Sequence, residues 1–260
     1  MKKLIEDLLV VSNKKLNPEF FVMRLLSPSK INEILPGQFV EVRIDGSPST
    51  FLRRPFSVYS IEPRKNIIEL LIRNAGPGSA HLAQLKKDQT INLIYPLGNS
   101  FSIPSKPNVL LVGGGTGVAP MLFLGMNLVE KQGIKPQFLL GYRTSGLIVE
   151  KDRFEAVGKT HITTEDGSYG YKGLVIHHPV ITSNPLHFNQ IYACGPEAMM
   201  KEVAKIAHRN NISCEVSLEN LMGCGFGACL CCIVDTIEKG NINTCTEGPV
   251  FNTKNLKWSI

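Results

Sequence analysis

Four of the seven cysteines in this 260-residue chain lie within nine positions, in the stretch GCGFGACLCC at residues 223–232. Cys224, Cys229 and Cys232 have the spacing C-x4-C-x2-C, and Cys245 follows after twelve intervening residues. This is the plant-type spacing for a [2Fe–2S] cluster, in which four thiolates hold two irons. The spacing therefore predicts an iron–sulfur site formed by one tight loop and a returning segment.

The glycines of this loop fit the same interpretation. Gly223, Gly225 and Gly227 can take positive φ values and bring backbone N–H groups close to the sulfurs. Structural zinc is the alternative, but such sites usually pair two short knuckles, and here a single short pair precedes one distant cysteine. For Cys231 and Cys214 we expect the role of small packed hydrophobic residues.

Two stretches in the first hundred residues could bind an anion. RRPFSVYS at 53–60 supplies Arg54 and Ser57 where a strand is expected, which suits a pyrophosphate. LIRNAGPGSAHL at 71–82 supplies Arg73 and a turn running into a helix start, whose free N–H groups attract anions. Each alone could be an ordinary turn with a satisfied arginine, whereas the two together favour one diphosphate ligand.

Two further motifs each follow a strand and open a helix. LLVGGGTGVAPM at 110–121 is not G-x-G-x-x-G, but its glycines let a nucleotide pyrophosphate approach the backbone closely. YACGPEAMM at 192–200 places Cys194 at the carboxyl end of a strand, where α/β sheets bind ligands. A buried structural cysteine and a functional one are equally compatible with that position.

The elements that position these motifs change character along the chain. Short alternating runs divided by Gly, Pro and Asp turns predict an antiparallel barrel or sandwich over residues 20–101, with one short helix near residue 81. After a linker at 103–108, apolar strands alternate with amphipathic helices, which predicts a parallel α/β sheet. The predicted strands are 109–117, 137–143 and 190–195, and the predicted helices are 119–133 and 196–211.

The chain is therefore expected to contain three domains, at 1–103, 104–211 and 212–260. The last segment holds six of the seven cysteines and is too short for a core of its own, so it needs a metal or a surface to dock on.

Composition excludes several classes of protein. A net charge of +6 with scattered Lys and Arg gives little support for nucleic-acid binding. Glu6 and Asp7 interrupt the apolar start, which argues against a signal peptide, and no apolar run is long enough to cross a membrane. Clustered cysteines are typical of metal or redox chemistry in a reducing compartment, so we expect a cytoplasmic protein.

The motifs R-P-F-S, G-P-G-S, G-G-G-T-G-V-A-P and C-G-P occur in the order of the ferredoxin–NADP reductase superfamily, which the chain resembles over nearly its whole length. The cysteine tail is similar to that of the electron transfer subunits of B-type dihydroorotate dehydrogenases. The resemblance implies an FAD-binding β-barrel, an NAD-binding α/β domain and a small [2Fe–2S] domain. Ser79 stands where relatives often have Thr, which preserves the hydroxyl.

The resemblance also implies site residues. Those expected to hold FAD are Arg54, Pro55, Phe56, Ser57, Leu71, Ile72, Arg73, Gly78 and Ser79. Those expected beside the nicotinamide nucleotide are Gly113, Gly114, Gly115, Thr116, Gly117, Cys194, Gly195 and Pro196. The cluster ligands would be Cys224, Cys229, Cys232 and Cys245. We name no general acid or base, because hydride transfer depends mainly on placement of the two rings.

In such proteins a catalytic subunit with its own FMN oxidises dihydroorotate in pyrimidine biosynthesis, and electrons pass through the cluster and FAD to NAD+. The resemblance thus implies a partner subunit, in a heterotetramer of two chains of each kind. Glu165 and Asp166 would favour NAD over NADP if they face the adenosine ribose, but a solvated acidic turn explains them equally well.

Two other functions are compatible with the sequence. Small subunits of NADH-dependent ferredoxin:NADP oxidoreductases or of sulfide dehydrogenases look similar, although some replace a cluster cysteine by a carboxylate. A zinc-bearing interaction module on a nucleotide-sensing domain would instead give a colourless protein.

Overall fold

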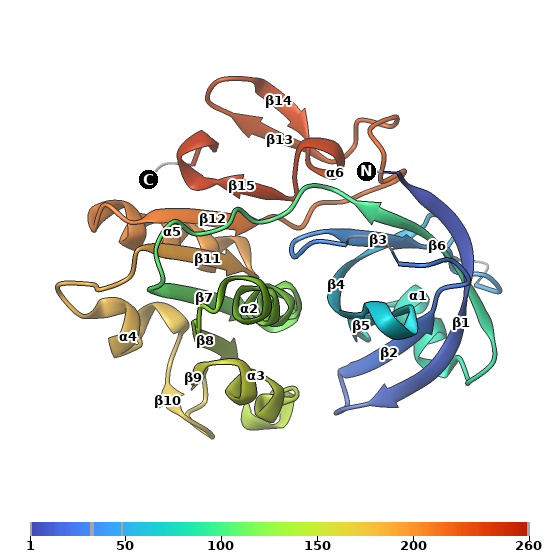
Figure 1. Cartoon of the computed structure of the whole chain (residues 1–260), viewed down its shortest axis with the longest axis horizontal. Coiled ribbons are helices and arrows are strands. Elements are labelled where there is room, and N and C mark those ends of the chain that lie inside the picture. The colour runs from blue at the N-terminus through green and yellow to red at the C-terminus, as the bar shows by residue number, and fades with distance from the viewer. Residues whose placement is uncertain (1, 32–33, 48, 259–260) are drawn as a thin grey trace.

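A computed structural model describes residues 2–31, 34–47 and 49–258 (Figure 1). Its first part is a closed antiparallel barrel with the strand order β1-β2-β5-β4-β3-β6, which confirms the predicted barrel. The strands are β1 (Leu4–Lys15), β2 (Phe20–Leu26), β3 (Phe39–Val42), β4 (Arg54–Glu62), β5 (Ile67–Arg73) and β6 (Thr90–Leu97).

Alternation along these strands fills the barrel. Leu8, Met23 and Leu70 are fully buried in one apolar core, because every second side chain of a barrel strand points inward. Helix α1 (Pro77–Gln84) adds Leu82 to that core. The short helix expected near residue 81 is thus present.

The second part is a seven-stranded sheet with the order β10-β9-β8-β7-β11-β12-β15. All its neighbours are parallel except β12 and β15. The strands are β7 (Val109–Gly114), β8 (Gln137–Tyr142), β9 (Lys159–Thr164), β10 (Tyr171–Lys172), β11 (Gln190–Cys194), β12 (Ser213–Ser217) and β15 (Val250–Asn252).

Helices cover both faces of this sheet. Helices α2 (Val118–Gln132) and α3 (Lys151–Val157) share one apolar core with the sheet, and α4 (Pro179–Thr182) and α5 (Glu197–Arg209) share another. Helix α2 lies between the sheet and the barrel (Figure 1) and packs against β4. The described residues contain no helix with both the length and the hydropathy needed to cross a membrane.

The expected third domain shares the second sheet. Strands β12 and β15 form its edge, and residues 219–249, here called the cysteine segment, lie between them in the chain. The segment contains the hairpin of β13 (Ile233–Thr236) and β14 (Gly240–Asn243) and the short helix α6 (Thr244–Glu247). A segment too short to bury its own core thus uses the sheet edge as an anchor, and the proposed boundary at 212 falls beside a strand of that sheet.

A polar network joins the barrel to α3. The Tyr59 hydroxyl donates to Glu150 Oε2 over 3.0 Å, and Arg153 forms ion pairs of 2.9 Å with both Glu150 and Glu69. The Arg153 guanidinium also lies over the Tyr59 ring, 4.8 Å from its centroid. Because Glu69 belongs to β5, these contacts fix the orientation of the two parts, and with it the cleft between them.

Candidate functional site

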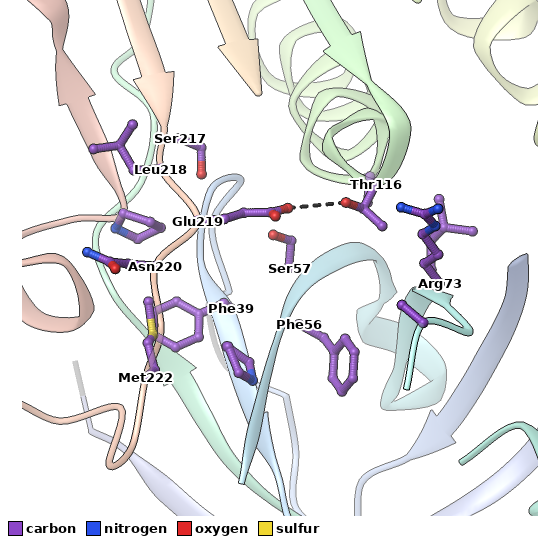
Figure 2. A pocket seen from close by; sticks show the side chains of 15 residues that line it. Phe39, Phe56, Ser57, Arg73, Thr116, Ser217, Leu218, Glu219, Asn220 and Met222 are labelled. Atoms are coloured by element: carbon purple, nitrogen blue, oxygen red, sulfur yellow. Dashed lines mark hydrogen bonds between the residues drawn. The ribbon is translucent and has the colours of Figure 1, made fainter. Parts of the chain in front are cut away.

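A cavity of about 360 Å³ lies where the barrel, α2 and the cysteine segment meet (Figure 2). Strand β4 contributes Pro55, Phe56 and Ser57 to it, and β5 contributes Leu71 and Arg73. These are five of the nine residues expected to hold FAD. Alternation explains the gap between Leu71 and Arg73, because the Ile72 side chain points into the barrel core. Any flavin contact of Ile72 must therefore come from its backbone.

The remaining three FAD candidates lie outside this cavity. Arg54 Nη1 donates to the carbonyls of Leu52 and Arg53, each over 3.2 Å. Gly78 packs below Thr50, with 3.1 Å between Thr50 Cγ2 and the position of an added Cβ. The Ser79 hydroxyl accepts from the N–H of Ala75 and of Gly76, so it organises the turn that starts α1. These positions suit a ligand that extends from the cavity toward α1.

A second cavity, of about 460 Å³, opens at the carboxyl ends of β7, β8 and β9. Its lining includes Gly114, Gly115, Arg143, Glu165 and Pro196. Parallel α/β sheets bind ligands at this edge, and here it joins a glycine turn to two charged side chains of opposite sign.

The glycines of the turn serve different purposes. An added Cβ at Gly117 would lie 2.1 Å from the Cys194 carbonyl oxygen, and one at Gly113 would lie 2.9 Å from Val118 Cα. Gly115 has open space but a φ of +57°. Gly113 and Gly117 therefore allow close packing of strand and helix, whereas Gly114 and Gly115 shape the cavity itself.

A third cavity, of about 730 Å³, continues between α5 and the cysteine segment. Thr116, Gly195 and Pro196 line it, and Arg73 borders all three cavities. Arg73 also pairs with Glu19 over 2.8 Å, and Arg143 pairs with the same carboxylate. The three cavities thus share lining residues and form one cleft between the barrel and the sheet.

Cys194 does not reach this cleft. Its side chain is 1% exposed, packs in the core beside α2 and lines none of the three cavities. Burial raises the pKa of its thiol. Its expected place beside the nicotinamide ring stays a prediction, whereas Gly195 and Pro196, which follow it in the chain, line the cleft.

Glu219 is a cleft residue that the sequence analysis missed. Thr116 Oγ1 donates to Glu219 Oε1 over 3.2 Å (Figure 2), and Glu219 lines both the first and the third cavity. Protein atoms lie around much of the Glu219 carboxyl group, and this desolvation raises its pKa. The Glu219 residue is nevertheless exposed, because one side of it opens to the cleft. Its position two residues beyond β12, at the carboxyl edge of the sheet, is the signal that could have found it.

The four cluster cysteines form two pairs of neighbours. Cys224 lies beside Cys229, and Cys232 lies beside Cys245. Cys232 and Cys245 are each 1% exposed, whereas Cys229 is exposed. Two pairs of thiols suit a centre with two irons, each of which takes two thiolates.

The backbone of the loop supports this arrangement. Gly225, Gly227 and Leu230 have φ values of 76°, 91° and 56°. The Ala228 N–H donates to Cys224 Sγ over 3.3 Å, as expected for amides that approach cluster sulfurs. Hydrogen bonds from Cys231 and Cys224 lower the pKa of Cys229 to about 6, which favours the thiolate that a metal needs. The residues present therefore fit a [2Fe–2S] group.

The expectation for Cys231 was wrong, and that for Cys214 is confirmed. Cys231 is exposed, and its Sγ lies 3.2 Å from Cys229 Sγ. The loop is too open at this end to bury a fifth cysteine. Cys214, on β12, is 2% exposed in the core of the sheet.

Phe39 connects the cleft with the cysteines. It lines the first cavity and belongs to an apolar cluster with Leu97, Cys232 and Cys245. Met222 lines the same cavity and packs against the same cluster. Phe39 and Met222 therefore contact both the cavity that the flavin candidates line and the inner cysteine pair.

Three family models match successive parts of the chain. An oxidoreductase FAD-binding domain matches residues 7–101, and an oxidoreductase NAD-binding domain matches residues 111–205. The iron-sulfur cluster binding domain of dihydroorotate dehydrogenase B matches residues 219–257. FAD-binding, NAD-binding and iron–sulfur domains are thus all present, as expected.

Whole-chain relatives agree with these models. The dihydroorotate dehydrogenase B (NAD(+)) electron transfer subunit of Bacillus caldolyticus is 37% identical over 249 residues, which cover 94% of this chain and 95% of that protein. The subunit of the same name from Shouchella clausii is 39% identical and covers 83% of this chain and 84% of that protein.

Solved structures resemble the fold at two levels of similarity. A chain from the structure of an NADH-dependent reduced ferredoxin-NADP oxidoreductase, described for flavin-based electron bifurcation, superposes with a TM-score of 0.87 at 30% identity. That superposition covers 96% of this chain and 90% of that one. A ferredoxin NADP+ reductase from Neisseria gonorrhoeae, with bound FAD and NADP, has a TM-score of 0.62 at 19% identity, covering 80% and 92%. The second likeness is one of fold alone.

Proposed function

This chain belongs to the family of dihydroorotate dehydrogenase B electron transfer subunits, and from that premise we propose that it carries electrons from a catalytic partner through [2Fe–2S] and FAD to NAD+. The observation that carries the proposal is the apolar layer of Phe39 and Met222, which separates the flavin cavity from the inner cysteine pair. Bound FAD would supply the conversion between single electrons and a hydride pair.

The first cavity is the proposed place of the flavin ring. Pro55, Phe56, Ser57 and Leu71 would bind the ring, and Arg73, at the junction of the cavities, would neutralise negative charge there. Gly78 and Ser79 lie at the start of α1, where free backbone N–H groups attract an anion. Together with Arg54 they would bind the diphosphate.

The second cavity is the proposed place of the nicotinamide nucleotide. Gly114 and Gly115 would approach its phosphates, and Glu165 would accept hydrogen bonds from ribose hydroxyls. The Asp166 carboxylate instead accepts from the N–H and the hydroxyl of Ser168. We therefore assign the preference for NAD over NADP to Glu165 alone of the two.

The proposed cluster ligands are Cys224, Cys229, Cys232 and Cys245. The partner would approach the exposed side of the cysteine segment, where Leu221, Phe226 and Leu230 are 85%, 50% and 58% exposed. Exposed apolar side chains around a redox site indicate an interface. We propose an FMN-containing dihydroorotate dehydrogenase subunit as that partner, in a heterotetramer of two chains of each kind, and a cytoplasmic location for the complex.

Anaerobic purification of the chain, alone and co-expressed with an FMN subunit, tests this function. We expect one FAD, two irons and two acid-labile sulfides per chain, and dihydroorotate-dependent reduction of NAD+ only in the complex. Zinc without flavin would refute the proposal.

The similarity to the ferredoxin-NADP oxidoreductase structure supports a second candidate function with the same cofactors. In that case the purified chain would carry flavin and cluster, but its complex would reduce NADP+ with NADH and reduced ferredoxin and would not reduce NAD+ with dihydroorotate. The same preparation therefore separates the two functions by the electron donor that it accepts.

A further inference from the structure

Glu41 on β3 is a buried acidic residue that the proposed electron path does not use. Its side chain is 0% exposed, and neither carboxyl oxygen has a hydrogen-bond partner among the described residues. A buried charge without partners is costly, so a carboxyl group in such a place needs an explanation.

The cysteine segment lies directly on this side chain. A Cβ added at Gly225 would lie 2.5 Å from Glu41 Cγ and 3.1 Å from Glu41 Oε1, so only a glycine fits above the carboxyl group. Gly225 follows Cys224 in the loop. The carboxyl group is therefore held below the backbone that presents the proposed cluster ligands.

The charged groups that face Glu41 are Arg53 and Arg54, from the segment leading into β4, and Cys229 of the loop. The guanidinium of Arg53 donates to the backbone carbonyls of Glu41 and Asn92 and to the Asn92 side chain. The guanidinium of Arg54 donates to carbonyls of its own segment. Both arginines attract the carboxylate from a distance, and neither forms an ion pair with it.

Burial is the dominant influence on this group. It raises the pKa of Glu41 to about 7, against the opposing attraction of Arg53 and Arg54. A carboxyl group that is buried without hydrogen-bond partners binds a proton more readily than an exposed one, and added negative charge in the loop above it favours that proton further.

We infer that Glu41 is the proton acceptor that compensates the charge of the cluster held by the loop above it. When one electron enters the cluster, one proton from solvent binds a carboxylate oxygen and forms an O–H bond. When the electron leaves for the flavin, that O–H bond breaks and the proton returns to solvent. The inference rests on the proposed function only in requiring the four cysteines to hold a [2Fe–2S] group.

The physical reason is the repulsion between two negative charges in a poorly solvated region. An added electron on the cluster disfavours the nearby carboxylate, so reduction and protonation of Glu41 promote each other. The midpoint potential of the cluster must then fall as pH rises through the range in which Glu41 titrates.

The test is a spectroelectrochemical titration of the cluster in the purified holoprotein from about pH 6 to about pH 9, on either side of that pKa. In the wild-type protein, the midpoint potential of the cluster should fall as pH rises. The largest possible slope is a tenfold change in the reduction equilibrium constant per pH unit, which is about 59 mV for one electron. Glu41→Gln keeps the shape and removes the charge, and it should give a flat profile. Asp45→Asn removes an exposed carboxylate three residues after β3. This variant should keep the wild-type dependence of midpoint potential on pH.

A flat wild-type profile, or an unchanged slope in Glu41→Gln, would overturn the inference while leaving the proposed function intact. Absence of iron and sulfide from the wild-type protein would refute both. If Glu41→Gln does not fold, infrared difference spectra of wild type decide the matter. Reduction must then produce the carbonyl stretch of a protonated carboxyl group, and a spectrum without that band would contradict the role of Glu41.

Discussion

The nucleotide cleft and the cysteine segment both contain glycine turns, but the glycines have different structural roles in the two regions. In the cleft, Gly113 and Gly117 let a buried strand and helix pack at distances that no side chain would allow. In the cysteine segment, Gly225 and Gly227 take positive φ values in a loop with exposed apolar side chains. The cleft is therefore formed by the fold itself, whereas the cysteine segment is an open loop that would bring its proposed ligands together around the cluster.

We therefore expect substitutions in the two regions to have different effects on stability and on cofactor binding. A cleft made from strand ends and a helix start should depend on packing in the α/β sheet. A cluster site made from side chains should depend on its ligands, with little effect on the barrel or the sheet. Four predictions test that distinction, from the largest expected effect to the smallest.

Cys232→Ser should abolish the cluster, because it removes one of the two buried ligands. Flavin content and the NADH-driven reduction of a small artificial acceptor should remain, since the cleft does not need the cluster. Iron analysis and the visible spectrum measure the first, and a diaphorase assay measures the second. Cys214→Ser, which changes a buried cysteine that is not a proposed ligand, is the matched control and should keep both. Loss of flavin in Cys232→Ser would contradict the independence of the cleft from the cluster.

Gly117→Ala should damage the cleft and not the cysteine segment. The added Cβ would lie 2.1 Å from the Cys194 carbonyl oxygen, and such overpacking costs about 3 kcal/mol. The thermal unfolding midpoint and the affinity for NADH should both fall. Gly133→Ala, at the end of α2, is the control, because its added Cβ would have no atom within 4 Å and the variant measures only the cost of a positive φ. Equal losses of stability and of NADH affinity in the two variants would contradict the packing argument.

Glu41→Gln should stabilise the protein at pH 8 and leave its stability at pH 4.5 nearly unchanged. The folded-state pKa of about 7 lies above the ordinary value of 4.5, so the folded protein keeps a proton that the unfolded chain has lost. Wild-type stability must then fall as pH rises from 4.5 to 7, by about 3 kcal/mol at most. Thermal unfolding at several pH values measures this, and a pH-independent difference between the proteins would exclude the mechanism.

Glu165→Gln should lower the preference for NADH over NADPH about tenfold, which corresponds to about 1.4 kcal/mol. The variant removes a negative charge from the lining of the second cavity. The ratio of kcat/KM for the two coenzymes measures the effect. Asp166→Asn is the control, because that carboxylate is bound to Ser168, and an equal shift in both variants would contradict the assignment.

The sequence predicted the features that depend on local pattern. The barrel, the parallel sheet and the helices after the glycine motifs follow from periodicity and turn residues, and the structure contains them. The strand alternation that places Leu71 and Arg73 in the cavity also turns Ile72 into the core, so this exception was itself readable from the chain.

The features that depend on packing between distant segments were not predictable in this way. Glu41 resembles any acidic residue on an alternating strand until Gly225 is placed above it. The three-residue strand β15 is too short to carry a pattern, so the return of the chain to the second sheet was missed. Cys231 has the sequence context of a packed cysteine, and the openness of the loop decides otherwise.

Phe39 gives the layer between the cavity and the cysteines a selective role. Hydride transfer needs the two reacting atoms within about 3.5 Å of each other, whereas an electron can tunnel through a side chain. In the proposed arrangement, a phenyl ring between the flavin and the inner cysteine pair would let electrons pass and would keep hydride out. The proposed arrangement would thus separate the two kinds of carrier by geometry, and a reduced nucleotide would deliver its electrons to the cluster through the flavin.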